Sequence, residues 1–560
     1  MHAFASDTSD NAEYDAIVIG SGMSGLVAGN HLAKQGLKVL MVESHSIPGG
    51  YTTNFYRKGF RFEVSTHMLN GCDPDGTIGK ILNDFDVYDK IEFKQLNSLL
   101  RWIDPTRNID ATLPVGIDAY VDQLCSLYPH EEKGIREFHE KYYPLAAWVV
   151  EYEQQRGLNK IAYALQNLPI LWRLLSLRRK TAADIIDPLI KDPACREILT
   201  VMTALFGLHY TELDAAIFVM GSMMFHASGS YYPIGGSGKL SKVLADRFAE
   251  YGGELWLRSH VEEIRFDENG VAKGVMMKDK KGNVISKSTK CVINCSDLST
   301  LVNKLCPEGT LQDNFVNKVR KHVPGNSLVV AWAGLDIDLK DRGVKDFEII
   351  RTNNLSEEMR GTKRLKEIMQ SADYSNLPVS GATIYSNIDP TCCSPGKSLI
   401  ATNFMASHDT FAQMLDSDGG RGVRYHELKD KVEKQLLDVM VDATGMADLA
   451  DHIEVVEVGT PITFERYTEN LGGSFMGWRN TPRQGAFSSF SPRTPIPNLF
   501  QCGQWLGVGG VASVMTTGLD AAKMATRYLD RLDKESKLET TDTMATDSPA
   551  SGSIGVVSFT

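Results

Sequence analysis

The chain opens with two apolar runs separated by a helical stretch. Residues 15–19 and 37–42 are largely apolar without polar alternation, which predicts strands buried on both faces of a parallel sheet. A glycine-rich turn at 20–25 leads into a helix that we expect to end near Gln35, where Gly36 can cap it. The first pattern in the chain therefore predicts a βαβ unit.

The rest of the chain divides into blocks in the same way. A mostly helical stretch at 118–225 precedes a glycine-rich turn at 232–239, which leads into a helix to about residue 251. The later patterns predict strands at 254–257, 260–264 and 291–294 with hairpin turns at 268–270 and 281–283, alternating strands and helices over 326–497, a buried strand at 498–503, and a last helix to about 532.

Length and charge narrow the classes of protein. A chain of 560 residues exceeds one ordinary core, so we expect two domains. The 59 Lys and Arg against 70 Asp and Glu give a net charge of −11, which argues against nucleic acid as a partner. The nine cysteines are scattered without a Cys/His spacing typical of metal sites, so we expect a reduced, cytoplasmic protein with no metal. The start of the chain lacks the basic and apolar parts of a signal peptide, and no apolar run is long enough to cross a bilayer.

The strongest chemical motif follows the first strand. It reads Gly20-Ser21-Gly22-Met23-Ser24-Gly25, and Glu43 stands at the end of the second strand. In such a motif the first glycine permits a tight turn, the second lets backbone approach a pyrophosphate, and the third lets the helix pack against the strand. The helix N-terminus favours the anion, and the acidic residue accepts hydrogen bonds from ribose hydroxyls. The motif predicts a dinucleotide site formed by Gly20, Gly22, Met23, Ser24, Gly25 and Glu43.

Two further segments favour FAD over NAD as the dinucleotide. Pro48-Gly49-Gly50-Tyr51 follows the acidic residue at a spacing that brings backbone against the FAD pyrophosphate and ribityl chain. Near the other end of the chain, the block 503–512 precedes a helix and offers a second helix N-terminus to the flavin end. The cofactor residues expected in these two segments are Gly49, Gly50, Tyr51, Gly503, Gln504, Gly510, Val511 and Ala512.

These blocks together resemble the FAD-dependent family of bacterial-type phytoene desaturases, carotenoid isomerases and retinol saturases, in its carotenoid isomerase and retinol saturase branch. The resemblance extends from about residue 13 to 532. It also rests on the segment 59–65, on the turn Tyr232-Pro233-Ile234-Gly235-Gly236, on Val261, whose backbone meets adenine in this fold, and on Arg466-Tyr467. Three residues depart from the family pattern: Gln504 replaces an acid, and Glu63 and Ser65 replace Asp and Gly.

The resemblance implies an α/β fold. It consists of an FAD-binding Rossmann-type, glutathione-reductase-like domain intertwined with a mixed α+β substrate domain that carries a helical, membrane-facing part. The expected divisions are a flexible leader at 1–12, a discontinuous FAD-binding domain at 13–90, 225–300 and 495–532, a substrate domain at 91–224 and 301–494 with its helical part near 120–224, and a disordered tail at 533–560.

The function implied is an FAD-dependent oxidoreductase that desaturates, saturates or isomerises an isoprenoid polyene, a lipophilic small molecule. No Ser/His/Asp arrangement, HExxH motif or paired carboxylates is present, so the cofactor is expected to perform the chemistry in a dry apolar tunnel. His67 is a candidate proton donor, or else a hydrogen-bonded structural histidine. Tyr467 is a candidate catalytic residue by resemblance, and Trp478 lines the substrate side or belongs to the core.

Residues 158–180 combine an apolar helical face with clustered Lys and Arg. The apolar members are Leu158, Ile161, Leu165, Leu168, Leu171, Leu174 and Leu175, and Pro169 predicts a break. This pattern fits a peripheral membrane contact, and it equally fits a buried helix with a solvated basic end. No pattern in the chain sets an oligomeric state.

Two other functions stay open at the level of sequence. The first is an amine-oxidase-like flavoenzyme for a smaller substrate, although the arginines that usually flank the glycine pair of that family are absent around residues 48–51. The second is a non-catalytic escort that binds lipid-modified partners without flavin, which the intact phosphate-binding turn disfavours.

Overall fold

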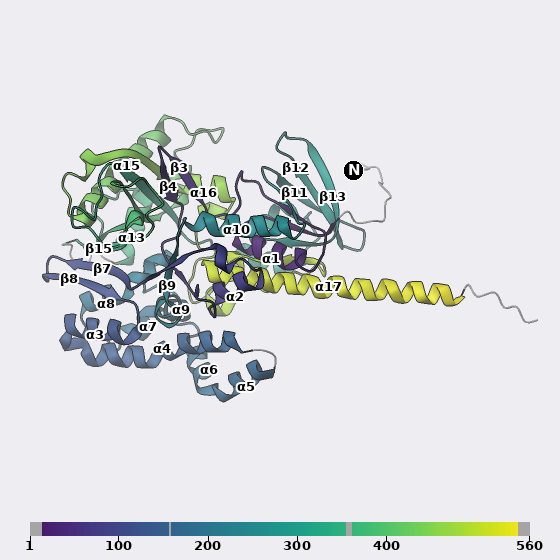
Figure 1. Cartoon of the computed structure of the whole chain (residues 1–560), viewed down its shortest axis with the longest axis horizontal. Coiled ribbons are helices and arrows are strands. Elements are labelled where there is room, and N and C mark those ends of the chain that lie inside the picture. The colour runs from purple at the N-terminus through teal and green to yellow at the C-terminus, as the bar shows by residue number, and fades with distance from the viewer. Residues whose placement is uncertain (1–13, 156–157, 354–360, 547–560) are drawn as a thin grey trace, which may run out of the picture.

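The computed structural model describes residues 14–155, 158–353 and 361–546. Two large sheets lie side by side, helices form a layer along one edge of the molecule, and the last helix extends from the body (Figure 1). The chain passes between the two sheets several times, so neither half of the molecule is continuous in sequence.

The first sheet contains the predicted βαβ unit, made by β1 (Tyr14–Ile19), α1 (Met23–Ala33) and β2 (Val39–Val42). The strand order is β10-β2-β1-β13-β12-β11, and β19 also pairs with β13. Alternate residues of β1 enter two different cores, which explains why this strand has no polar face. The remaining strands are β10 (Glu254–Trp256), β11 (His260–Phe266), β12 (Ala272–Lys278), β13 (Val284–Asn294) and β19 (Leu499–Gln501).

Two helices pack with α1 against this sheet: α10 (Ser237–Glu250), which follows the predicted glycine-rich turn, and α17 (Val511–Thr546). The final helix continues beyond Leu532, so the disordered tail predicted from residue 533 does not begin there. Lys and Glu, which are strong helix formers, recur after Leu532, and a helix that is already packed elongates without a new nucleus. The predicted leader at 1–12 and residues 547–560 lie outside the described part of the chain.

The second sheet has the strand order β18-β14-β17-β16-β15-β7-β8 and is mainly antiparallel, with β15 and β7 parallel. Its central strand β14 is buried along its whole length, because neighbouring strands flank it and other elements cover both of its faces. The strands are β7 (Ser98–Asp104), β8 (Ile109–Pro114), β14 (Ser327–Leu335), β15 (Glu348–Thr352), β16 (Val379–Ile384), β17 (Ser398–Ala406) and β18 (Ile453–Gly459).

The helical stretch predicted at 118–225 forms its own apolar core, which also receives residues from β7 and β8. The helix breaks at Asn167, between α5 and α6, as expected near Pro169. Pro169 itself lies in the first turn of α6. The helices are α3 (Ile117–Leu127), α4 (Glu132–Gln154), α5 (Leu158–Gln166), α6 (Leu168–Leu175), α7 (Ala182–Ile186), α8 (Pro193–Thr200) and α9 (Ala215–Ala227).

Smaller elements connect these layers. The other strands are β3 (Asn54–Arg57), β4 (Phe60–Glu63), β5 (Leu69–Asn70), β6 (Phe93–Leu96) and β9 (Ser230–Pro233). The other helices are α2 (Thr77–Asp84), α11 (Leu298–Thr300), α12 (Asp313–Lys321), α13 (Thr362–Ser371), α14 (His408–Ala412), α15 (Val423–Thr444) and α16 (Pro461–Thr468). Short helical turns are η1 (Tyr88–Lys90), η2 (Pro129–Glu131), η3 (Val201–Phe206), η4 (Leu301–Leu305), η6 (Tyr385–Asn387), η7 (Leu449–His452), η8 (Leu471–Gly473), η9 (Ala486–Ser488) and η10 (Gln504–Leu506).

Candidate functional site

The turn between β1 and α1 is shaped by its three glycines. Gly20 has φ +94°, a conformation that disfavours any residue with a Cβ. A Cβ at Gly25 would lie 2.0 Å from the carbonyl oxygen of Gly20, so only glycine lets α1 pack this closely against the strand end. A Cβ at Gly22 would meet nothing within 4 Å, and no side chain caps the helix that begins after it. The first turn of α1 therefore presents N–H groups to open space, which suits an anion.

Glu43 holds this turn in place from the end of β2. Its Oε2 accepts hydrogen bonds from the backbone nitrogen and the hydroxyl of Ser21, both at 2.8 Å, and its Oε1 accepts one from the nitrogen of His45 at 2.8 Å. Glu43 and Val261 on β11 line the same cavity as the turn. The acid thus lies where the motif predicted a ribose contact, and it also orders the turn itself.

The segment 48–51 lies directly beside the first turn. The nitrogen of Gly49 donates to the carbonyl of Ser21 at 2.9 Å, and Gly49 forms a β-bridge with Gly22. Gly49 has φ +121°, and a Cβ there would lie 2.3 Å from the carbonyl oxygen of Thr52, so no larger residue fits. Next to it, the hydroxyl of Tyr51 donates to the carbonyl of Ser474 at 3.1 Å.

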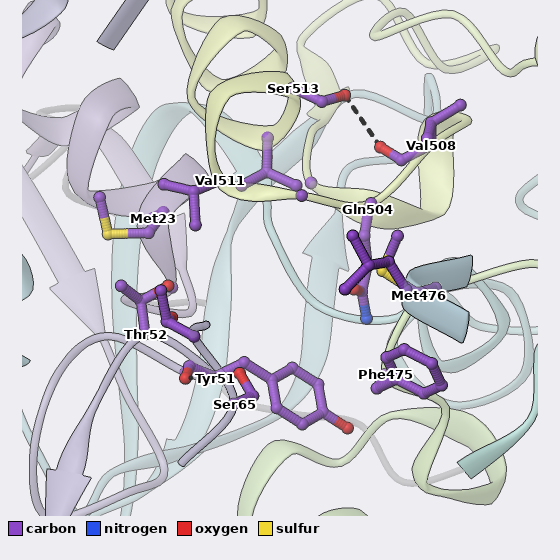
Figure 2. Close-up of a pocket in the computed structure, with 18 of the residues that line it drawn as sticks. Met23, Tyr51, Thr52, Ser65, Phe475, Met476, Gln504, Val508, Val511 and Ser513 are labelled. Carbon is purple, nitrogen blue, oxygen red and sulfur yellow. Dashed lines mark hydrogen bonds between the residues drawn. The ribbon is translucent and has the colours of Figure 1, made fainter. Parts of the chain in front are cut away.

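The closing block brings a second helix N-terminus to the same place. α17 begins at Val511 after Gly510, which has φ +102° and has nothing within 4 Å of the position of a Cβ. A Cβ at Gly518 would lie 2.2 Å from the carbonyl oxygen of Ser24, so α17 crosses α1 at contact distance. In the close-up, Val511 and Met23 lie on one side of the cavity and Tyr51 lies opposite (Figure 2).

A cavity of about 970 Å³ extends from these turns to the second sheet. All the cofactor residues predicted from the sequence line it: Gly20, Gly22, Met23, Ser24, Glu43, Gly49, Gly50, Tyr51, Val261, Gly503, Gln504, Gly510, Val511 and Ala512, with Gly25 as the exception. Gly25 lies behind the turn, where it acts through packing. Beyond the turns the walls are mainly apolar, and they come from α9, β14, β16 and β17.

Gln504 and Glu63 are two of the departures from the family pattern, and only Gln504 lines the cavity. Gln504 projects into the cavity near Met476 (Figure 2). Glu63 is buried and accepts hydrogen bonds from Tyr232 at 3.1 Å and from the nitrogen of Ser237 at 2.8 Å. Burial raises the pKa of Glu63, against the lowering effect of these donors. Glu63 therefore attaches the second glycine-rich turn to β4.

His67 belongs to a polar cluster in the apolar wall. Its Nδ1 lies 3.2 Å from Oε2 of Glu348 and 2.9 Å from the hydroxyl of Thr383. Its Nε2 lies 3.2 Å from Nδ2 of Asn403. Burial lowers the pKa of His67, but the charge of Glu348 and its hydrogen bond raise it above 6.5 overall. We refer to His67, Glu348, Thr383 and Asn403 as the His67 cluster.

A second chamber of about 670 Å³ adjoins the first. The residues shared by the two chambers are His67, Met68, Ala204, Leu205, Glu348, Ile350, Val379, Phe404 and Met405. His67 and Glu348 therefore lie at the junction, whereas Thr383, Asn403 and the glycine-rich turns line only the first chamber.

Tyr467 does not join His67. The residue is 51% exposed and its ring makes an edge contact with His45, so it lies beside the Glu43 end of the cavity. Trp478 is only 1% exposed and donates its indole N–H to the carbonyl of Trp505 at 2.8 Å, which makes it a core residue. The structure thus selects the core alternative for Trp478 and separates the two catalytic candidates.

Sequence reasoning missed the three partners of His67. Glu348, Thr383 and Asn403 belong to three strands far along the chain, and each of these strands carries other polar residues as well. The sequence therefore does not say which polar residues meet. Among the described residues, no group of His, Cys, Asp or Glu is arranged to hold a metal ion.

Comparison with known proteins tests the resemblance. A family profile described as an NAD(P)-binding Rossmann-like domain matches residues 18–85. The chain is 25% identical over 531 residues to all-trans-retinol 13,14-reductase of Danio rerio, a match that covers 90% of this chain and 85% of that protein. It is 26% identical over 523 residues to the chloroplastic prolycopene isomerase of Daucus carota, covering 91% and 79%. The predicted resemblance is confirmed.

A solved structure confirms the fold class. Cyclohexylamine oxidase from Brevibacterium oxydans superposes with a TM-score of 0.55 at 16% identity, over 93% of this chain and 99% of that chain. At this identity the likeness is one of fold alone. It therefore confirms a Rossmann-like nucleotide-binding domain within a mixed α/β protein, and it adds no weight to an amine as the substrate.

Proposed function

We propose that the chain is an FAD-dependent oxidoreductase acting on C=C or CH–CH bonds of an isoprenoid polyene. The observation that supports this most is the division of one cavity into two kinds of wall. Two helix N-termini and glycine-only turns line one end, and apolar side chains line the rest. A charged dinucleotide suits the first part, and a long apolar substrate suits the second.

The residues present fit FAD as the dinucleotide. The open space at Gly22 and Gly510 lies at the starts of α1 and α17, where a pyrophosphate and a flavin can approach bare backbone. Glu43 and Val261 would hold the adenosine half, and Tyr51, Gly503 and Gln504 would hold the flavin half. When bound, FAD supplies the two-electron chemistry that adds or removes hydrogen across a C–C bond.

The protein's own residues position the polyene and exclude water. Apolar side chains from α9 and the second sheet surround the substrate part of the cavity, so a polyene bound there is desolvated and held along one path. His67 is the proposed proton donor, because its ring lines the cavity and the carboxylate of Glu348, 3.2 Å from Nδ1, favours the doubly protonated imidazolium, which has a proton to give. The two relatives named above are, by name, a reductase of all-trans-retinol and an isomerase of prolycopene. Reduction and isomerisation both need the polyene to lie at the same place in the cavity.

We propose a lipid bilayer with anionic headgroups as the partner of α5 and α6. These helices lie at the lower edge of the molecule, apart from both sheets (Figure 1). Their outward apolar side chains include Trp172, 70% exposed, and Leu165, 62% exposed. Residues 178–180, Arg-Arg-Lys, follow directly and are exposed. An apolar face with adjoining positive charge is what an interfacial helix needs.

The lining of the cavity supports a membrane at the exposed face of α5 and α6. Its lining includes Leu174 on α6, and also Val149 and Glu153 on α4, next to the exposed apolar face. A lipophilic substrate would then pass from the bilayer into the cavity without crossing water. Within the described residues, no helix is both long and apolar enough to cross a membrane, so the proposed contact is peripheral.

The proposal is tested on the purified full-length protein by its visible spectrum and by anaerobic addition of polyenes to the reduced form. If retinol or a carotenoid reoxidises the reduced bound flavin, and the spectrum of oxidised flavin returns, oxidoreductase chemistry is supported. A change in polyene geometry with the flavin still reduced supports isomerisation. Turnover of amines alone would favour the amine-oxidase-like alternative. Absence of flavin after reconstitution with FAD would contradict the proposal and favour a lipid-binding escort.

A further inference from the structure

Two cysteines meet beside the dinucleotide turn, just beyond the ends of neighbouring parallel strands. Strands β13 and β19 pair in register up to Asn294 and Gln501, and Cys295 and Cys502 are the next residue of each. Adjacent strands lie about 4.8 Å apart, which is within the Cα separation of about 4.4–6.8 Å that a disulfide spans. The pairing of the strands therefore holds the two cysteines at a separation that a disulfide can bridge.

The two thiols are already in close contact. Their sulfur atoms lie 2.8 Å apart, although the residues are 207 positions apart in the chain. Two non-bonded carbon atoms pack best at about 3.5–4.0 Å, and sulfur is the larger atom. The sulfur atoms of the adjacent residues Cys392 and Cys393 are 3.9 Å apart. Of these two pairs, Cys295 and Cys502 need the smaller movement to form a bond.

The pair lies between the two parts of the dinucleotide site. The nitrogen of Cys295 donates to the carbonyl of Ile19 at 2.8 Å, directly before the first glycine-rich turn. Cys502 precedes Gly503, the first residue of the closing block, whose nitrogen donates to the hydroxyl of Thr517 on α17 at 3.0 Å. A bond between the two sulfurs would thus fasten the strand beside the first turn to the segment that leads into α17.

The two cysteines differ in how accessible they are. Cys295 is partly exposed and lines the cavity, whereas Cys502 is fully buried. A small oxidant that enters the empty cavity therefore reaches Cys295 first, and Cys502 is the neighbouring thiol that can react with the product. Desolvation in the cavity wall raises the pKa of the Cys295 thiol, so little thiolate is present and the oxidation is slow.

We propose that Cys295 and Cys502 are an oxidation site, which hydrogen peroxide converts to a disulfide while the cavity holds no dinucleotide. The Cys295 thiolate attacks one oxygen of the peroxide, the O–O bond breaks, and a sulfenic acid and hydroxide form. The hydroxide takes the proton that the thiol gave up. The thiol of Cys502 then attacks the oxidised sulfur, the S–O bond breaks, and the oxygen leaves as water. Two thiols and one peroxide thus give one disulfide and two molecules of water.

The disulfide stabilises the flavin-free protein. The 207 positions between the two cysteines form a long loop, and a crosslink removes more entropy from the unfolded chain when the loop is long. The crosslink also keeps the two glycine-rich segments together when no ligand holds them. FAD bound along the turns covers Cys295, so the loaded protein keeps both thiols; this protection rests on the proposed function, whereas the disulfide itself does not.

The test is peroxide treatment of the flavin-free full-length protein, followed by blocking of free thiols and mass spectrometry of the unreduced peptides. We expect a crosslinked pair of peptides that contain Cys295 and Cys502, and a melting temperature about 3–10 °C above that of the reduced protein. Dithiothreitol should reverse both changes. FAD at ten times its dissociation constant should slow the crosslinking about tenfold, because about a tenth of the sites stay empty.

One variant and one matched control locate the effect. Cys502→Ala removes the second thiol, so peroxide should produce neither the crosslink nor the rise in melting temperature. Cys291→Ala is the control, because Cys291 is also buried and lies on β13, and its thiol contacts the carbonyl oxygen of Asp15 at 3.6 Å. This control should still form the crosslink. The melting temperature of each untreated variant shows that it is folded.

Each contrary result has its own meaning. Peroxide treatment that yields no crosslink, or one between other cysteines, overturns the proposal. A crosslink between Cys295 and Cys502 that leaves the melting temperature unchanged overturns the stabilising role. Crosslinking at the same rate with and without bound FAD overturns the protection. A protein that forms the crosslink but binds no FAD contradicts the proposed function and leaves the oxidation site standing.

Discussion

The hydroxyl of Thr383 lies 2.8 Å from Oε2 of Glu348, and the two residues are direct cross-strand partners on β16 and β15. This pair provides a fixed carboxylate for His67, whose Nδ1 reaches both of them. The arrangement depends on the strand register, because a shift of either strand by one residue would turn its side chain to the opposite face of the sheet, away from its partner.

The His67–Glu348 pair should make stability depend on pH. The folded protein raises the pKa of His67 above 6.5, because the charge and hydrogen bond of Glu348 outweigh burial. A group whose pKa is raised on folding stabilises the fold below its unfolded pKa, and this contribution is lost as pH rises through the folded value. We therefore expect His67→Gln to lower the melting temperature most below pH 6.5 and progressively less above it.

A double-mutant cycle separates this pair from other histidines. In a Glu348→Gln background, His67→Gln should lose most of its pH-dependent effect on the melting temperature. A His67→Gln effect that is constant from acid to alkaline pH, or that survives unchanged in the Glu348→Gln background, would contradict the pairing.

Because the space beside Gly22 is open, Gly22→Ala should weaken FAD binding without disturbing the fold. Gly22 has φ −61° and no neighbour within 4 Å of a Cβ, so Gly22→Ala should fold normally while its methyl group occupies the space near the helix start. We expect FAD affinity to fall at least about tenfold, since the methyl group displaces the ligand from the N–H groups. FAD titration of the apoprotein measures this.

Gly361 supplies the matched control. It is also the residue before a helix, with φ −79° and nothing within 4 Å of a Cβ, but it lies outside the dinucleotide turns. Gly361→Ala should bind FAD as the unchanged protein does. Equal FAD affinity in Gly22→Ala would contradict the assignment of this turn.

Because α1 and α17 cross in contact, Gly518→Ala should change stability in the opposite direction to an ordinary Gly→Ala substitution in a helix. Gly→Ala within a helix ordinarily stabilises it by roughly 1 kcal/mol. At Gly518 the added Cβ would lie 2.2 Å from the carbonyl oxygen of Ser24, so α17 must move away from α1. We expect Gly518→Ala to destabilise the protein by about 1–3 kcal/mol, as overpacking does, and to weaken FAD binding. A rise in the melting temperature would show that the two helices do not cross this closely.

The exposed face of α5 and α6 predicts binding to anionic vesicles. Leu165→Asp replaces a side chain that is 62% exposed and should weaken sedimentation with vesicles containing phosphatidylserine about tenfold, because an apolar contact is lost and a negative charge added. Val284→Asp introduces the same charge at a residue that is 60% exposed on β13, away from the helices, and should have little effect. Equal behaviour of the two variants would argue against this face as the membrane contact.

The dinucleotide half of the site could be predicted in detail because its parts are close in sequence. Gly20, Gly22 and Gly25 belong to one turn, and Glu43 ends the next strand, so their meeting needs only a single βαβ unit. The closing block at Gly503 was located by its own glycine spacing. Local motifs of this kind keep their geometry wherever they occur, and therefore the spacing alone predicts the structure.

The sequence by itself determined that this chain has a βαβ unit with a pyrophosphate-type turn, a second glycine-rich helix start and an apolar stretch with a basic end at 158–180. Tertiary structure alone decided that α5 and α6 turn their apolar face outward and that His67 meets Glu348, Thr383 and Asn403. The physical reason is the separation along the chain of the residues that must meet. Spacing within one turn or helix sets the first group of features, whereas the second depends on which strands pair, in which register, and on which surfaces remain uncovered when the chain is packed.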